Sequence, residues 1–243
     1  QTASAESILR TAPAQGRYRE QALAAYANLA MGHGDYESAA TVWSALLRET
    51  PWSAVGKAAQ VAYPSSLERV AGPQAALNEY RRAEGNFEKR LGDLAGLAAS
   101  MDDVRWRDRL LRGLAQLQEG SSPLDPAVQE WRGRIGNDDW LAWFNADQTQ
   151  LLLQEWRDLD AMALWLSSVR ATRPAPGFDT RTYALAARVA RLGDDRSAHL
   201  TAPLREIVRS EEVMAQRQIV LIRAGIARTT DRIAENRATA GSR

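Results

Sequence analysis

The residues best suited to chemistry lie together in the stretch NDDWLAWFNADQ at residues 137–148. It sets Asp138 and Asp139 beside aromatic side chains. A glycan site combines such residues, with rings that stack on a sugar and carboxylates that transfer protons. The same pattern also fits an N-terminal cap followed by a buried i, i+3, i+4 stripe. We keep a glycan-binding or hydrolytic module as one alternative and favour the structural interpretation. The aromatic residues concerned are Trp140, Trp143 and Phe144.

Other catalytic or metal-binding patterns are sparse. The chain has no cysteine, which excludes disulfides, thiolate zinc sites and cysteine nucleophiles. Its two histidines, His33 and His199, are far apart in the sequence, and no His-x-x-x-His pair suits zinc. Neither a G-x-S-x-G motif nor a glycine-rich phosphate loop is present. We therefore expect no enzyme activity, no cofactor and no metal.

Charge and hydropathy narrow the classes of partner. The chain carries 31 basic and 30 acidic residues, and this net charge of +1 indicates neither nucleic acid nor an anionic membrane. No apolar run approaches the roughly 18–20 residues of a membrane-spanning helix, so we expect no integral span. The chain opens at Gln1 with QTASAES, which is typical of a mature chain after signal-peptide removal and equally of an arbitrary boundary. We expect a periplasmic or otherwise exported protein.

The elements that position these residues are expected to be helices throughout. Ala, Leu, Arg, Glu and Gln dominate the sequence. No stretch in which β-branched residues alternate with polar ones is long enough to predict a sheet. Clusters of Gly, Pro, Ser and Asp separate the helices, and the two strongest linkers are 119–126 and 173–177. The sequence predicts an all-α fold with helices near 17–33, 36–49, 53–62, 74–99, 102–119, 127–135, 138–170, 179–192 and 197–236.

Residues 20–53 predict a helical hairpin. Gly34 ends its first helix, because glycine tolerates the positive φ of a helix C-terminus, and Asp35 caps the second. Ala39 faces Ala27, and these small residues let the two helix axes approach closely. The small–aromatic–small face of the second helix returns 37 residues later in the stretch GPQAALNEYRRAEG.

This spacing resembles the tetratricopeptide repeat (TPR), a helical hairpin of about 34 residues. Trp43 fills the space towards the next hairpin, and Pro51 stops the second helix. The resemblance covers about residues 17–85, and the chain is also similar in style to exported TPR-type proteins of Gram-negative bacteria. The matching residues are Ala27, Gly34, Asp35, Tyr36, Ala39, Trp43, Leu46 and Pro51, then Gly72, Ala76, Tyr80 and Ala83 in the second unit.

The rest of the chain has to complete the module. Pro64 interrupts the first helix of the second unit, so we expect either a kink there or a restart at 65–71. Because at least three repeats are usually needed to bury a continuous core, other helices must cover the exposed end. The segment 102–170, with six of the eight tryptophans, is the natural candidate. The expected organisation is therefore a TPR-like module at 1–100 and a long-helix region at 101–243.

The last expected helix, 197–236, has a pattern of its own. Ile219, Ile226 and Ile233 recur every seven residues with Ile222 between them, which indicates a short coiled-coil seam. This helix either packs back on the repeat module, or projects and self-associates, or binds a charged surface through its arginines.

The resemblance implies a non-catalytic scaffold or adaptor, because stacked hairpins of this kind form a groove that holds peptides or partner helices. We expect a protein or peptide partner in the cell envelope. The first helix of each hairpin is expected to face the groove, which makes Tyr26, Asn28 and Met31 candidate partner-binding residues. The amide of Asn28 can both donate and accept. The alternatives are the glycan-binding or hydrolytic module at 137–148 and a coiled-coil oligomeriser dominated by 197–236.

Overall fold

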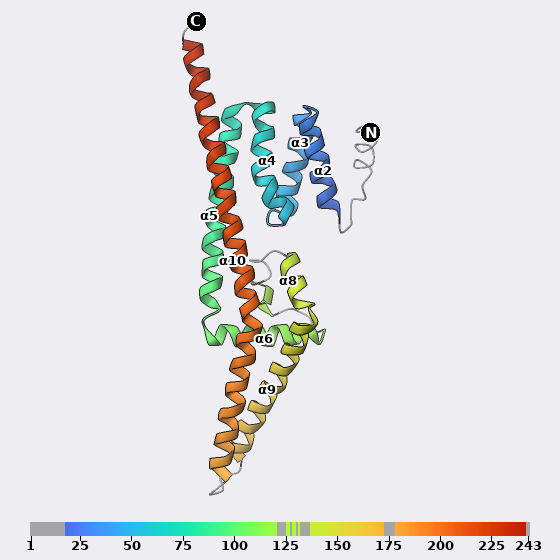
Figure 1. Ribbon diagram of the computed structural model, residues 1–243, viewed down its shortest axis with the longest axis vertical. Helices are drawn as coiled ribbons and strands as arrows, with labels where there is room; N and C mark the ends of the chain where they lie inside the picture. Colours follow the sequence, from blue (N-terminus) through green and yellow to red (C-terminus); the bar gives the residue numbers. More distant parts are fainter. Residues whose placement is uncertain are drawn as a thin grey trace. The chain divides into compact units, whose positions relative to one another are not determined.

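A computed structural model describes residues 18–120, 125–126, 128–129, 131, 137–172 and 178–241 of the chain. In these residues every regular element is a helix and no strand occurs, which confirms the all-α prediction (Figure 1). The opening residues 1–17, most of the expected helix 127–135 and the linker 173–177 lie outside the described part. The helices are α2 (Arg19–Gly32), α3 (Tyr36–Glu49), α4 (Ala54–Ala71), α5 (Pro73–Ser100), α6 (Val104–Gln118), α8 (Asn137–Phe144), α9 (Asp147–Thr172) and α10 (Phe178–Gly241).

The chain divides into two compact units, and α5 and α10 contribute to both. Among the described residues, the first unit holds those up to Gly92 together with those from Val213 onward, and the second holds those from Asp93 to Glu212. The last part of α10, from Val213 onward, therefore groups with α2, α3 and α4, and the expected long-helix region 101–243 is divided between the two units.

The hairpin of α2 and α3 forms as its local signals predict. Gly34 adopts a φ of 82°, and the side chain of Asp35 accepts a hydrogen bond from the backbone N–H of Ser38 at 3.1 Å. Ala27 and Ala39 are fully buried in one cluster, so their small side chains permit the close approach of the two helices. The same cluster contains Trp43, Leu46 and Ala59, and Ala59 lies on α4. Trp43 thus packs towards the next hairpin, as expected.

Helix α4 does not stop near residue 62. It continues through Pro64 to Ala71, where Gly72 adopts a φ of 87° and separates it from α5. Proline has no backbone N–H, so the helix loses one hydrogen bond at this position. Pro64 is buried, and its packing offsets part of that loss.

The exposed side of the second hairpin is covered by the last part of α10, not by the segment 102–170 that the sequence suggested. Ala76, Tyr80, Ala83 and Phe87 of α5 form one buried cluster with residues of α10. Arg223 adds ion pairs to the carboxylates of α5, with Nε 2.6 Å from Glu84 and Nη2 3.0 Å from Glu88. The α10 residues in or against the cluster are Ala215, Ile219, Ile222 and Ile226.

The expected coiled-coil seam is therefore occupied by a helix of the same chain. Ile219 and Ile222 are buried and Ile226 is partly buried against α5. Gly225 lies among them, and a Cβ at that position would come within 2.7 Å of the Tyr80 ring. The seam thus combines branched apolar residues with one position where only glycine fits.

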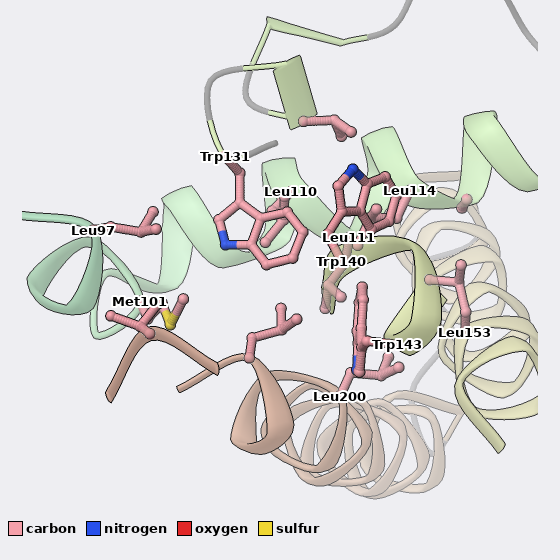
Figure 2. Packing of buried hydrophobic residues seen from close by; sticks show 14 of the residues in the cluster. Leu97, Met101, Leu110, Leu111, Leu114, Trp131, Trp140, Trp143, Leu153 and Leu200 are labelled. Carbon is pink, nitrogen blue, oxygen red and sulfur yellow. The ribbon is translucent and has the colours of Figure 1, made fainter. Parts of the chain in front are cut away.

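The second unit is built around tryptophans. Trp131, Trp140 and Trp143 are buried, and their ring centroids lie 5.4–6.1 Å apart. Figure 2 shows these rings with Leu110, Leu111 and Leu114 of α6 and with Leu200 of α10. Aromatic rings at such spacings pack favourably in edge-to-face geometry.

Two helix boundaries in this unit differ from the predictions. The expected helix 138–170 is interrupted at residues 145–146, which separate α8 from α9. The expected break at Gly193–Asp195 is absent, and α10 runs continuously through Gly193 and Pro203. A single glycine costs a helix only about 1 kcal/mol. Flanking buried residues such as Val189 and Leu200 hold the segment in place against that cost.

Candidate functional site

The described part of the chain has a pocket of about 420 Å³ in the first unit, bounded by α3, α4 and α5. Its walls combine apolar surface from Leu47, Tyr63 and Pro64 with several polar side chains. Pro51, in the connection between α3 and α4, also lines the pocket. A concave site with apolar walls and a few convergent polar groups is the usual form of a binding pocket.

The floor of the pocket is a buried amide. Gln60 of α4 is only 2% exposed, and its Nε2 donates a hydrogen bond to the carbonyl oxygen of Pro51 at 3.2 Å. Its Oε1 accepts from Nδ2 of Asn86 of α5 at 3.4 Å. The amide therefore ties α4 to both neighbouring elements. Because both of its polar groups are engaged, it serves as a fixed part of the pocket wall.

The rim is formed by two arginines with different surroundings. Arg82 pairs with Glu79 of the same helix at 2.6 Å, and the Arg82 side chain remains 61% exposed. Arg48, in the last turn of α3, is exposed and has no hydrogen-bond or ion-pair partner among the described side chains. A guanidinium offers five N–H donors in a planar fork, which suits backbone carbonyls and carboxylates.

The pocket is poorly equipped for acid–base catalysis. Its only carboxylate among the described residues is Glu79, which is held by Arg82, and no histidine lines it. Within the described residues no group of three or more His, Cys, Asp or Glu side chains could hold a metal ion. The arrangement is suited to holding a ligand by hydrogen bonds and apolar contact.

The three candidate partner-binding residues of α2 do not share one exposed surface. Tyr26 is buried, Met31 is partly buried against the cluster around Trp43, and Asn28 is exposed. Only Asn28 of these three therefore presents its full side chain to a partner. The pocket lies instead between the second helices of the two hairpins, α3 and α5, with α4 behind them.

Sequence reasoning missed Arg48, Gln60 and Asn86. These residues lie on three different helices, and no motif or period links them. The one signal in the sequence was the position of a polar residue within the expected repeat, since Gln60 precedes Pro64 by one helical turn. That signal is too common in helices to single out a site.

The aromatic residues of the alternative glycan site lie in the core of the second unit. Trp140 and Trp143 are buried, and Phe144 packs against Trp140 with ring centroids 4.8 Å apart. These rings are not available for stacking on a sugar. The side chains of Asp138 and Asp139 lie outside the described part.

None of the described helices is both long enough and apolar enough to cross a membrane. Comparisons with protein-family models, with curated proteins and with solved structures found no match.

Proposed function

We propose that this chain is a non-catalytic scaffold or adaptor that binds a protein or peptide partner through the first unit. The observation that carries the proposal is the pocket between α3, α4 and α5, with a buried amide as its floor and Arg48 open at its rim. Two successive helical hairpins support a TPR-like architecture, in which neighbouring helices supply binding surface and no catalytic group is required.

The pocket suits a short segment of a partner. Its volume lies in the range of about 300–1,000 Å³ that holds small ligands. The Oδ1 of Asn86 can accept from a backbone N–H, while Arg48 can donate to a backbone carbonyl or a carboxylate. Tyr63 and Leu47 supply the apolar contact. These groups suit an extended peptide chain, which presents both donors and acceptors.

The location in the cell envelope remains part of this proposal and rests on the resemblance to exported repeat proteins. Fractionation of the native cells, followed by detection of the intact protein, tests it directly. Recovery of the protein in the cytoplasmic fraction would contradict the location without affecting the pocket.

The binding function is tested with the full chain as bait in an envelope extract, followed by titration of the recovered partner by calorimetry. Arg48→Ala should weaken binding about tenfold or more, because a hydrogen bond to a charged group contributes roughly 1.5–3 kcal/mol. Arg81→Ala is the matched control, since Arg81 is exposed on α5 and does not line the pocket. Circular dichroism establishes that both variants stay folded.

Asn28→Ala distinguishes binding at the pocket from binding at the surface of α2. If Asn28→Ala abolishes binding while Arg48→Ala matches the control, the partner binds α2 and the pocket is not the site. If neither substitution affects a partner that binds the intact chain, the first unit is not the binding unit.

A further inference from the structure

The hairpin formed by α9 and the beginning of α10 has an apolar surface that no described residue covers. Figure 1 shows these two helices of the second unit side by side and running in opposite directions. Trp165 is 60% exposed, and Met162, Leu185 and Leu192 are each more than 40% exposed. Isolated exposed apolar residues are common, but several of them on one hairpin indicate an interaction surface.

The register of the hairpin places these residues close together. Nε of Arg196 lies 2.8 Å from Oε2 of Glu155, so positions 155 and 196 are opposite each other. Moving towards the connection between the helices, position 162 then lies near 189 and position 166 near 185. Leu166 and Val189 are almost fully buried, so we take their positions as the side of each helix that faces its neighbour, the seam of the pair.

Four of the exposed apolar residues of the hairpin lie on one side of that seam, whereas Leu164 and Tyr183, which are also exposed, do not. Met162 and Trp165 precede Leu166 by four and one residues, and at about 100° per residue both fall on the same flank of α9. On α10, Leu185 precedes Val189 by four residues and Leu192 follows it by three, which is the corresponding flank. Two antiparallel helices are related by a two-fold axis perpendicular to the plane that contains both helix axes. The corresponding flanks of the two helices therefore lie on the same face of the hairpin. We call this set, Met162, Trp165, Leu185 and Leu192, the hairpin face.

The hairpin face is bordered by arginines. Arg188 precedes Val189 by one residue and Arg181 by eight, so both lie on the flank of Leu185. Both are exposed, and neither has an ion-pair partner among the side chains that the structure describes. Residues 161–192 contain five arginines and one aspartate, a charge of +4, whereas the whole chain carries +1.

We propose that the hairpin face binds the surface of an anionic lipid membrane. Exposed tryptophan and aliphatic side chains enter the boundary between headgroups and acyl chains, while neighbouring arginines attract acidic headgroups. A second copy of the chain fits less well, because its identical face would bring Arg181 and Arg188 against like charges. Nucleic acid also fits less well, because phosphate contacts would leave Met162 and Leu192 in water.

The proposal is tested by sedimentation of the full chain with two kinds of vesicle. One kind contains equal parts of phosphatidylcholine and phosphatidylglycerol, and the other contains phosphatidylcholine alone. The chain should bind the anionic vesicles, bind them more weakly as salt is raised, and leave the neutral vesicles unbound. This surface binding is separate from the pocket of the first unit, so the two proposals can fail independently.

Two pairs of variants locate the contact. Trp165→Ser should weaken vesicle binding about tenfold, because the indole no longer leaves water. Its matched control is Val220→Ser, which removes a 66% exposed apolar residue from α10 in the first unit. Arg188→Glu should weaken binding to the anionic vesicles, whereas Arg217→Glu, an equal charge change in the first unit, should weaken it much less.

Three results would overturn the inference. The first is equal binding to neutral and anionic vesicles, and the second is unchanged binding by both hairpin variants. The third is no vesicle binding by the intact chain. This result can take two informative forms: dimers in light scattering that Trp165→Ser dissociates, or retention of duplex DNA that Arg188→Glu abolishes. Those two forms of the third result would assign the hairpin face to self-association or to nucleic acid.

Discussion

Gly225 should tolerate no side chain, because it faces the ring of Tyr80. A Cβ at Gly225 would lie 2.7 Å from both Cε1 and Cζ of Tyr80. Carbon atoms in ordinary contact are about 3.5–4.0 Å apart, so the overlap is close to 1 Å. The ring has little room to move, since Tyr80 is 1% exposed within its cluster. We expect a steric cost of about 1–3 kcal/mol for Gly225→Ala.

The helix propensity of alanine partly hides this cost, and a second glycine corrects for it. Alanine stabilises a helix by about 1 kcal/mol relative to glycine. Gly85 lies on α5 in the same unit and is exposed, and a Cβ placed there would meet no other atom within 4 Å. Gly85→Ala should therefore raise the free energy of unfolding, and the difference between the two variants measures the steric cost alone.

The measurement is urea-induced unfolding followed by far-ultraviolet circular dichroism. Gly225→Ala should shift the midpoint to lower urea relative to Gly85→Ala, without a change in slope. In a Tyr80→Leu background the steric cost should largely disappear, because the ring that causes it is gone. If Gly225→Ala is as stable as Gly85→Ala, α10 does not pack on α5 with Gly225 against the Tyr80 ring. If the cost persists with Tyr80→Leu, another contact is responsible.

Further substitutions probe other parts of the fold. Gly56→Ala should cost about 3 kcal/mol or more in urea unfolding, because its Cβ would lie 1.8 Å from the carbonyl oxygen of Thr50, and unchanged stability would contradict that approach. Asp35→Ala should lower the free energy of unfolding by about 1 kcal/mol through the lost cap of α3, whereas an unaltered midpoint would show that the cap is dispensable. Burial raises the pKa of the Tyr80 phenol above its unfolded value of about 10. The neutral phenol therefore contributes to the stability of the fold below about pH 10, and this stability is lost as pH rises through the folded pKa. Tyr80→Phe should therefore reduce the fall in stability on the alkaline side, and an identical alkaline profile in both proteins would rule out this assignment. Trp140→Ala should cost about 3–5 kcal/mol in thermal unfolding, because it leaves a cavity in the core of the second unit. A much smaller loss of stability would indicate that the neighbouring rings collapse into the space.

Local signals were sufficient for the first hairpin. Gly34 and Asp35 act on backbone groups within a few residues, so their roles follow from residue type and position alone. The burial of Ala39 and Ala76 likewise follows from a period that the chain displays directly. These features could be predicted because the interactions that determine them are short in sequence.

The candidate site could not be predicted in the same way. Gln60 and Asn86 are 26 residues apart and meet only because α4 and α5 pack together. The positions of Tyr26 and Asn28 were assigned to a groove from the resemblance, yet their exposure depends on the direction of each side chain in the packed hairpin. Long-range contacts of this kind leave no periodic trace in a single sequence.

The sequence by itself determined that the chain is helical, where its first hairpin turns, and which small residues lie at the helix contacts, because propensity, capping and period are local properties. Only the tertiary structure decided that α10 continues through Gly193 and Pro203 and that its last part covers α5. Packing against distant residues outweighs a local cost of a few kcal/mol. Charge follows the same division, because the near-neutral total and the charge of +4 at residues 161–192 are set by composition, whereas folding decides which of these arginines lie beside the hairpin face.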